Sequence, residues 1–128
     1  MAMVHHVSLG SNDMGKALTF YDACMEVLGY KRVMDFAPFA VGYGVDHPEF
    51  WIQQPHDRAR ASVGNGVHIC FDAKSEAQIA AFYEAALKHG GIDDGPPGPR
   101  PDYGHHYYGA FVRDPDGNKI EAVTYSAR

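Results

Sequence analysis

The chain has 128 residues, of which 45% are hydrophobic, enough for one core of ordinary size over residues 1–128. Its 16 acidic residues outnumber 11 basic ones, and no cluster of Lys or Arg occurs, which excludes nucleic acid and anionic membranes as expected partners. No apolar stretch approaches the ~20 residues that cross a bilayer, and two cysteines do not make a disulfide framework, so we expect a cytoplasmic protein.

The first half of the chain predicts the order β-α-β-β-β. Residues 3–9 alternate like a strand, and Ser11-Asn12-Asp13 then supplies a helix start. A helix is expected over 14–28, with Gly29 as its end. Shorter strand-like runs follow at 31–37, 39–43 and 49–54.

The second half predicts the same order. Residues 66–71 are strand-like, Ser75 is a candidate helix cap, and a helix is expected over 76–89. A strand near Ile92 precedes a Pro/Gly-rich loop at 95–101, which we expect not to join a regular ladder. Strands follow at 106–112 and 119–125, and residues 114–118 form a tight turn with Gly117 left-handed.

A single offset of 62 residues relates the two halves. The matching pairs are His6 and His68, Phe20 and Phe82, and Gly29 and Gly91. Two amphipathic helices can match simply because each buries one stripe, but constant spacing across strand, helix and stop favours duplication. We expect modules at about 1–56 and 64–128, joined by a linker, because neither half alone would bury much core.

The repeat suggests where chemistry lies. Paired about a pseudo-twofold axis, the modules of this α+β protein would form an open eight-stranded, barrel-like sheet with the helices outside, and His6 and His68 would meet in its cavity. Glu121 lies in an otherwise apolar strand, where a carboxylate is costly without a partner such as a cation. Two imidazoles and a carboxylate suit a divalent Fe, Mn, Zn, Ni or Co ion. A pair of hydrogen-bonded core histidines without metal is the alternative.

The same segments resemble a known family. His-Val-Ser-Leu at 6–9, Gly-Val-His at 66–68 and Asp-Pro-Asp-Gly-Asn-Lys-Ile-Glu at 114–121 are similar to the vicinal oxygen chelate superfamily of glyoxalases, extradiol dioxygenases and bleomycin-resistance proteins. The resemblance implies metal ligands at His6, His68 and Glu121. A fourth ligand, commonly Glu in glyoxalases, would fall at Trp51, or at Gln53 after a shift of two. Since an indole N–H cannot bind a metal, the three-ligand arrangement of extradiol dioxygenases is favoured.

Further candidates surround this set. Glu121 and His106 are candidate catalytic groups, although an exposed loop histidine without a role is the alternative for His106. Four residues are candidates for the substrate pocket: Trp51, Gln53, Cys70 and Tyr108. Trp51 could equally fill the floor of the barrel, and packing of a small buried hydrophobe would also explain Cys70.

These expectations support three functions. The first is a metal-dependent lyase or dioxygenase that chelates vicinal oxygens of a small substrate. The second is a metal-free pocket that sequesters a small aromatic or drug-like compound, and the third is a scaffold with a collapsed cavity. A homodimer is expected because open barrel edges need cover, with modules pairing within one chain or between chains.

Overall fold

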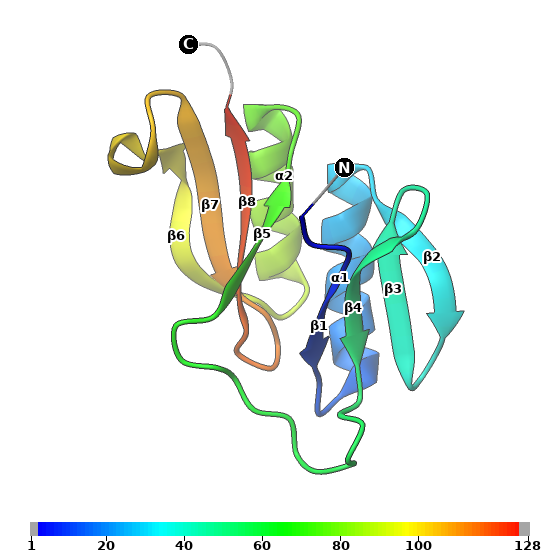
Figure 1. The fold of residues 1–128 in the computed structure, drawn as a ribbon. Helices are drawn as coiled ribbons and strands as arrows, with labels where there is room; N and C mark the ends of the chain where they lie inside the picture. The colour runs from blue at the N-terminus through cyan, green and yellow to red at the C-terminus, as the bar shows by residue number, and fades with distance from the viewer. Residues whose placement is uncertain (1–2, 126–128) are drawn as a thin grey trace.

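The computed structural model describes residues 3–125, and its first half has the predicted order (Figure 1). The elements of this half are β1 (Val7–Gly10), α1 (Met14–Leu28), β2 (Lys31–Phe36), β3 (Ala40–Gly44) and β4 (Pro48–Gln53). The prediction that the first strand starts at residue 3 is wrong, because β1 begins at Val7 and leaves His6 in the segment before it.

The second half repeats the pattern after a linker without helix or strand. Its elements are β5 (His68–Asp72), α2 (Glu76–Lys88), β6 (Ile92–Pro99), the 3-10 turn η1 (Pro101–Tyr103), β7 (Tyr107–Arg113) and β8 (Lys119–Tyr125). The Pro/Gly-rich segment does join the sheet, contrary to expectation, with register shifts at Asp93/Gly95 and Gly95/Gly98. β6 is an edge strand, where a proline without an N–H is tolerated on the unpaired side.

Both helices begin where their caps predict. The Asp13 side chain accepts from the Lys16 N–H, and Ser75 accepts from the Gln78 N–H. α1 ends at Gly29, whose φ of 89° is the left-handed conformation that glycine adopts without strain. No helix within residues 3–125 is long and apolar enough to span a membrane.

The strands form two separate four-stranded sheets, in the orders β1-β4-β3-β2 and β5-β8-β7-β6. Each sheet has its helix on one face, and α1 and α2 pack side by side (Figure 1). The α+β class and the two β-α-β-β-β modules are therefore confirmed. The two sheets do not close into one barrel within this chain, which corrects the expected eight-stranded sheet, because helix packing joins the modules and leaves one face of each sheet open.

The core lies between the helices and the sheets. Phe20, Tyr21 and Phe82 are fully buried, as the helical stripes predict. The Tyr21 hydroxyl donates to Asp114 Oδ2 at 2.5 Å, across the boundary between the modules. Burial raises the pKa of Asp114, although its hydrogen bonds from Tyr21 and Asn118 act in the opposite direction.

The turn between β7 and β8 forms hydrogen bonds with the first module. Gly117 has φ 92°, which confirms its predicted left-handed position. From this turn, Asp116 accepts the Asn12 backbone N–H at 2.8 Å, and Asn118 Nδ2 donates to the Gly10 carbonyl at 3.4 Å. The Asp-Pro-Asp-Gly-Asn segment is therefore both a hairpin turn and a contact with the start of the chain.

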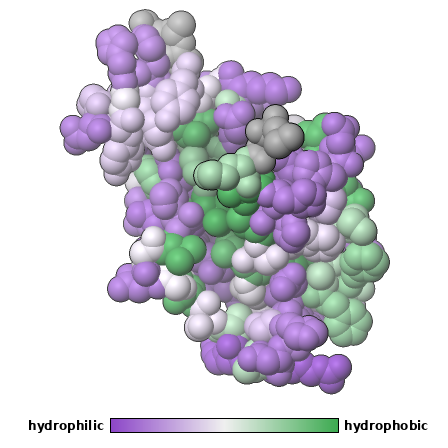
Figure 2. Space-filling view, viewed as in Figure 1, coloured by the Kyte–Doolittle hydropathy of each residue, from purple (hydrophilic) through white to green (hydrophobic). Residues whose placement is uncertain are grey.

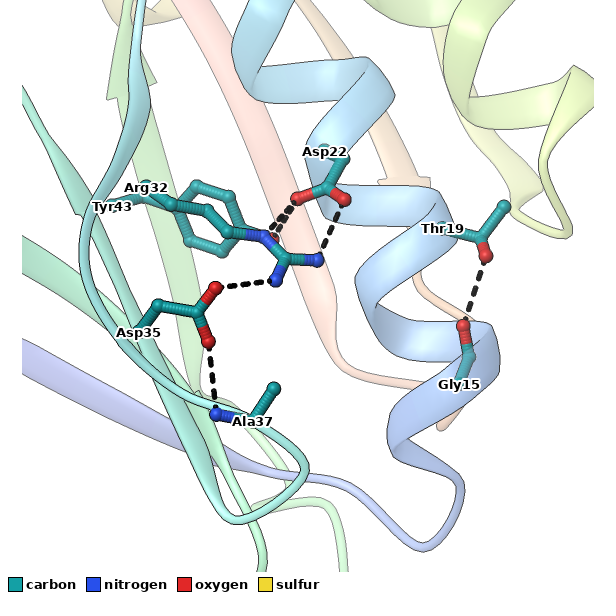
Figure 3. A network of polar contacts seen from close by, with 7 residues as sticks. All are labelled: Gly15, Thr19, Asp22, Arg32, Asp35, Ala37 and Tyr43. Atoms are coloured by element: carbon teal, nitrogen blue, oxygen red, sulfur yellow. Dashed lines mark hydrogen bonds and ion pairs between the residues drawn. The ribbon is translucent and has the colours of Figure 1, made fainter.

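A second polar network lies near the surface of the first module (Figure 3). Arg32 binds both carboxylate oxygens of Asp22, at 2.8 and 2.7 Å, and also Asp35 at 3.0 Å. The Tyr43 hydroxyl donates to Asp22 at 2.7 Å. Because the Asp22 side chain is about half exposed, this network ties β2 and β3 to α1 in contact with water.

A candidate site on the open face of the second sheet

Glu121 is a buried carboxylate on the sheet face that carries no helix. Only 1% of the residue is exposed, although it lies on the same face of β8 as the exposed Tyr125. Its Oε1 is 3.1 Å from His68 Nε2, and its Oε2 accepts a short hydrogen bond from the Tyr107 hydroxyl. Three strands, β5, β7 and β8, thus bring one polar side chain each to this point.

Gly109 makes room for the contact between Tyr107 and Glu121. A Cβ at this position would lie 3.0 Å from Glu121 Oε2 and 3.4 Å from Tyr107 Cε1. The tyrosine ring therefore crosses a residue without a side chain to reach the carboxylate. Burial, and then the hydrogen bond to Glu121, raise the pKa of Tyr107, so its hydroxyl stays protonated and donates at neutral pH.

His68 lines a pocket of about 370 Å³ together with Lys119 and Arg113. The His68 side chain is 43% exposed. Lys119 Nζ also lies 5.1 Å from the centroid of Phe111, the residue paired with Glu121 in register. A small molecule reaching His68 would therefore meet cationic groups and an aromatic ring.

Cys70 lies beside Glu121 in register and is exposed, which corrects the expectation of a buried cysteine. Partial burial of its thiol, followed by the Glu121 carboxylate, raises the Cys70 pKa, and the thiol stays protonated at neutral pH. Together His68, Cys70, Tyr107 and Glu121 form what we call the polar face. Cys24, by contrast, is buried as expected.

His6 does not join this group. Its Nδ1 lies 2.8 Å from that of His5, whose ring is 4.9 Å from the ring of His47. Over residues 3–125, no three His, Cys, Asp or Glu side chains are grouped to hold a metal ion. The structure brings together two of the three predicted ligands, His68 and Glu121, and leaves the third in the other module.

Apolar side chains cluster on the open face of the first sheet. Trp51 stacks on Phe36 with their planes 5° apart, and it lies over Gly42, where a Cβ would be 3.0 Å from the indole. Met34 and Phe36 are 42% and 55% exposed. We call Met34, Phe36 and Trp51 the apolar face. Gln53 lies on the same side, one alternation beyond Trp51.

Register shows which residue of the first module corresponds to Glu121. Ser8 pairs with Trp51, and Cys70, which is 62 residues after Ser8, pairs with Glu121. Trp51 therefore occupies the position equivalent to Glu121, as the sequence predicts. The first module therefore has an aromatic side chain at the position where the second module has Glu121.

Two other predicted residues lie away from Glu121. Tyr108 packs against the core, on the face of β7 opposite to Tyr107. His106 lies in the turn before β7 with its ring 4.2 Å from that of His105. Sequence reasoning missed Tyr107, which strand alternation would have indicated once the register between β7 and β8 was known.

Comparisons with known proteins agree with this architecture. The family profile described as the Glyoxalase/Bleomycin resistance protein/Dioxygenase superfamily matches residues 3–122. The chain is 36% identical to a glyoxalase/bleomycin resistance protein from Albidiferax ferrireducens T118, with a TM-score of 0.85 over 95% of this chain and 98% of that one. None of the curated proteins compared with the chain matches it.

More distant solved structures share the fold. A glyoxalase-related enzyme from Fulvimarina pelagi has 21% identity and a TM-score of 0.72, covering 96% of this chain and 88% of that one. A lactoylglutathione lyase from Agrobacterium tumefaciens has 20% identity and a TM-score of 0.63, covering 96% and 93%. From the profile and the structure that is 36% identical, the chain belongs to the glyoxalase/bleomycin resistance protein/dioxygenase superfamily.

Proposed function

We propose that the chain is a metal-dependent enzyme, a lyase or a dioxygenase, acting on a small substrate with adjacent oxygen atoms. The observation that carries the proposal is Glu121, a carboxylate buried to 1% exposure with an imidazole at 3.1 Å. A buried carboxylate is costly unless it is paired, and His68 and Glu121 are both ligands that first-row divalent ions accept. These two residues therefore fit two of the three ligand positions.

The third ligand in this proposal is His6 of a second copy of the chain. Within one chain the two sheets are separate, and each keeps an open face. Met34 and Phe36 of the apolar face are exposed, and an exposed apolar cluster favours burial against a partner. The polar face carries the candidate ligands. If the alternation of β1 is continued two residues back from Ser8, His6 falls on the side of Trp51. Docking the apolar face of one copy on the polar face of another would bring His6 toward His68.

Bound at this site, a divalent ion would supply Lewis acidity toward the oxygens of the substrate. The chain's own residues then have defined tasks. Tyr107 donates to Glu121 and fixes the orientation of the carboxylate, with Gly109 leaving the space for that contact. Trp51 would give an apolar wall to a substrate held between the two faces.

Subunit complementation tests this proposal. Glu121→Ala and His6→Ala are each expected to lose the metal that wild-type protein retains after purification without chelators. The matched control, His89→Ala at the end of α2, should keep it. When the two deficient variants are unfolded together and refolded as a mixture, sites that take His6 from one chain and Glu121 from the other should recover metal. A mixture that recovers none, from variants that each lost it, would refute the shared site.

A second function has its own support. His68 Nε2 lies within hydrogen-bonding distance, 3.1 Å, of Glu121 Oε1, and such a direct pair would satisfy the buried carboxylate in a metal-free binding protein. A pocket of about 370 Å³, lined mainly by apolar groups including Phe50, Ile69 and Phe71, also lies where the modules meet. Figure 2, which has the same orientation as Figure 1, shows apolar surface at its centre, in the region of β5 and β1. Wild-type protein that purifies without metal, and is stabilised against heat by aromatic compounds, would favour this function.

A further inference from the structure

The linker between β4 and β5 borders a pocket lined by basic side chains. The pocket has a volume of about 960 Å³, and its lining includes residues at the ends of β1 and β4. The linker itself runs beneath the first module in Figure 1. His56, Arg58 and Arg60 come from the linker, while Asn12 and Gln53 come from the two strand ends. Every polar side chain in this wall is therefore neutral or positively charged.

The pocket has positively charged side chains and no acidic ones. None of its lining residues is Asp or Glu, in a chain whose net charge is −5. Over residues 3–125, all the ion pairs of arginine involve Arg32 or Arg113, so the guanidinium groups of Arg58 and Arg60 lack an acidic partner. The nearest acidic neighbour in sequence, Asp57, turns back to accept the Ala59 N–H at 2.9 Å.

The wall of the pocket is held in place by hydrogen bonds. The Asn12 side chain donates to the Ala61 carbonyl at 3.0 Å and accepts the Ala61 N–H at 2.7 Å. The Arg58 N–H donates to the Pro55 carbonyl, and Arg58 itself has φ 62°, a left-handed backbone that is unfavourable for a residue with a side chain. The linker thus presents Arg58 and Arg60 from a fixed conformation, which lowers the entropic cost of binding a ligand.

We propose that this pocket binds a small organic oxyanion, a carboxylate or a phosphate, through Arg58 and Arg60. The planar guanidinium group matches both kinds of anion with two parallel hydrogen bonds. Side-chain amides of Asn12 and Gln53 add neutral donors. Phe39 also lines the pocket, and its 65% exposed side chain offers a ring to the carbon skeleton of the ligand. This site lies apart from His68 and Glu121 and requires no metal.

Titration with two probes tests the site, with amide NMR spectra of the full chain as the readout. Inorganic phosphate and acetate are added separately at constant ionic strength, so that the stronger one identifies the preferred anion. We expect saturable shifts confined to residues 56–61 and to the amides of Asn12 and Gln53. The double variant Arg58→Gln/Arg60→Gln should bind the preferred probe at least about tenfold more weakly, because charge-assisted hydrogen bonds are lost.

The matched control removes the same charge elsewhere. Lys31→Gln/Lys74→Gln changes two exposed lysines that do not line the pocket, and it should bind as the wild type does. Shifts that do not saturate with either probe, or an equal loss of binding in the control, would overturn the proposal. Binding that survives unchanged in the double arginine variant would overturn it as well.

Discussion

Replacing Tyr21 by Phe should destabilise the protein far more than replacing Tyr43 by Phe. Both changes delete a hydroxyl that donates to an aspartate, at 2.5 Å to Asp114 and at 2.7 Å to Asp22. Asp114 is 2% exposed, whereas the Asp22 side chain is 46% exposed and keeps its two bonds to Arg32. Water can replace the lost donor only at Asp22. The carboxylate of Asp114 would instead lose a donor where water cannot reach it, so Tyr21→Phe should cost more.

The expected magnitudes follow from these environments. Loss of a charge-assisted hydrogen bond in the interior costs about 2 kcal/mol, while the exposed site should lose less than about 1 kcal/mol. For a chain of this length the entropy of unfolding is about 0.27 kcal/mol/K, so Tyr21→Phe should lower Tm by about 7 °C. Urea unfolding and calorimetry measure both variants. Equal costs, or a larger cost for Tyr43→Phe, would refute the reasoning that burial of the aspartate sets the difference.

Three further outcomes are expected. Tyr107→Phe should weaken metal binding about 10- to 100-fold by freeing Glu121 from its donor, and Tyr125→Phe, on an exposed neighbour, should not. Gly42→Ala should cost about 1 to 3 kcal/mol, since its Cβ would meet Pro48 at 2.6 Å, while Gly15→Ala should cost nothing because its nearest contact is 3.5 Å. Burial raises the pKa of Tyr21 above its ordinary value, so its contribution to stability is present below about pH 10 and is lost as the pH rises further. The free energy of unfolding, measured with urea from pH 8 to 11, should therefore fall less steeply with pH for Tyr21→Phe than for the wild type.

Local signals predicted most of the fold. The cap at Asp13 and the glycine at position 29 place α1 at the predicted residues, because both act within one turn of the helix. The edge strand β6 escaped prediction, since prolines and glycines disfavour a strand and only its position at the sheet edge permits them. Strand pairing is a property of the whole sheet, and no local pattern reveals it.

The site shows the same division between local and long-range information. The sequence predicted Trp51, or Gln53 after a shift of two, at the position equivalent to Glu121, and the observed registers of β1 with β4 and of β5 with β8 agree with Trp51. The separation of His6 from His68 and Glu121 within residues 3–125 was not predicted, since it depends on how the two helices pack the modules together. Tyr107 was missed for a related reason, because its neighbour at 108 has the same side chain on the opposite face.

The metal content of the wild-type protein tests the account most directly. Protein purified without chelators or an affinity tag, and analysed by mass spectrometry of its metals, should contain a stoichiometric divalent ion of the first transition row. The Glu121→Ala variant, folded and purified in parallel, should contain none. Wild-type protein that remains free of metal even after incubation with Fe, Mn, Zn, Ni and Co salts would contradict the proposed enzyme.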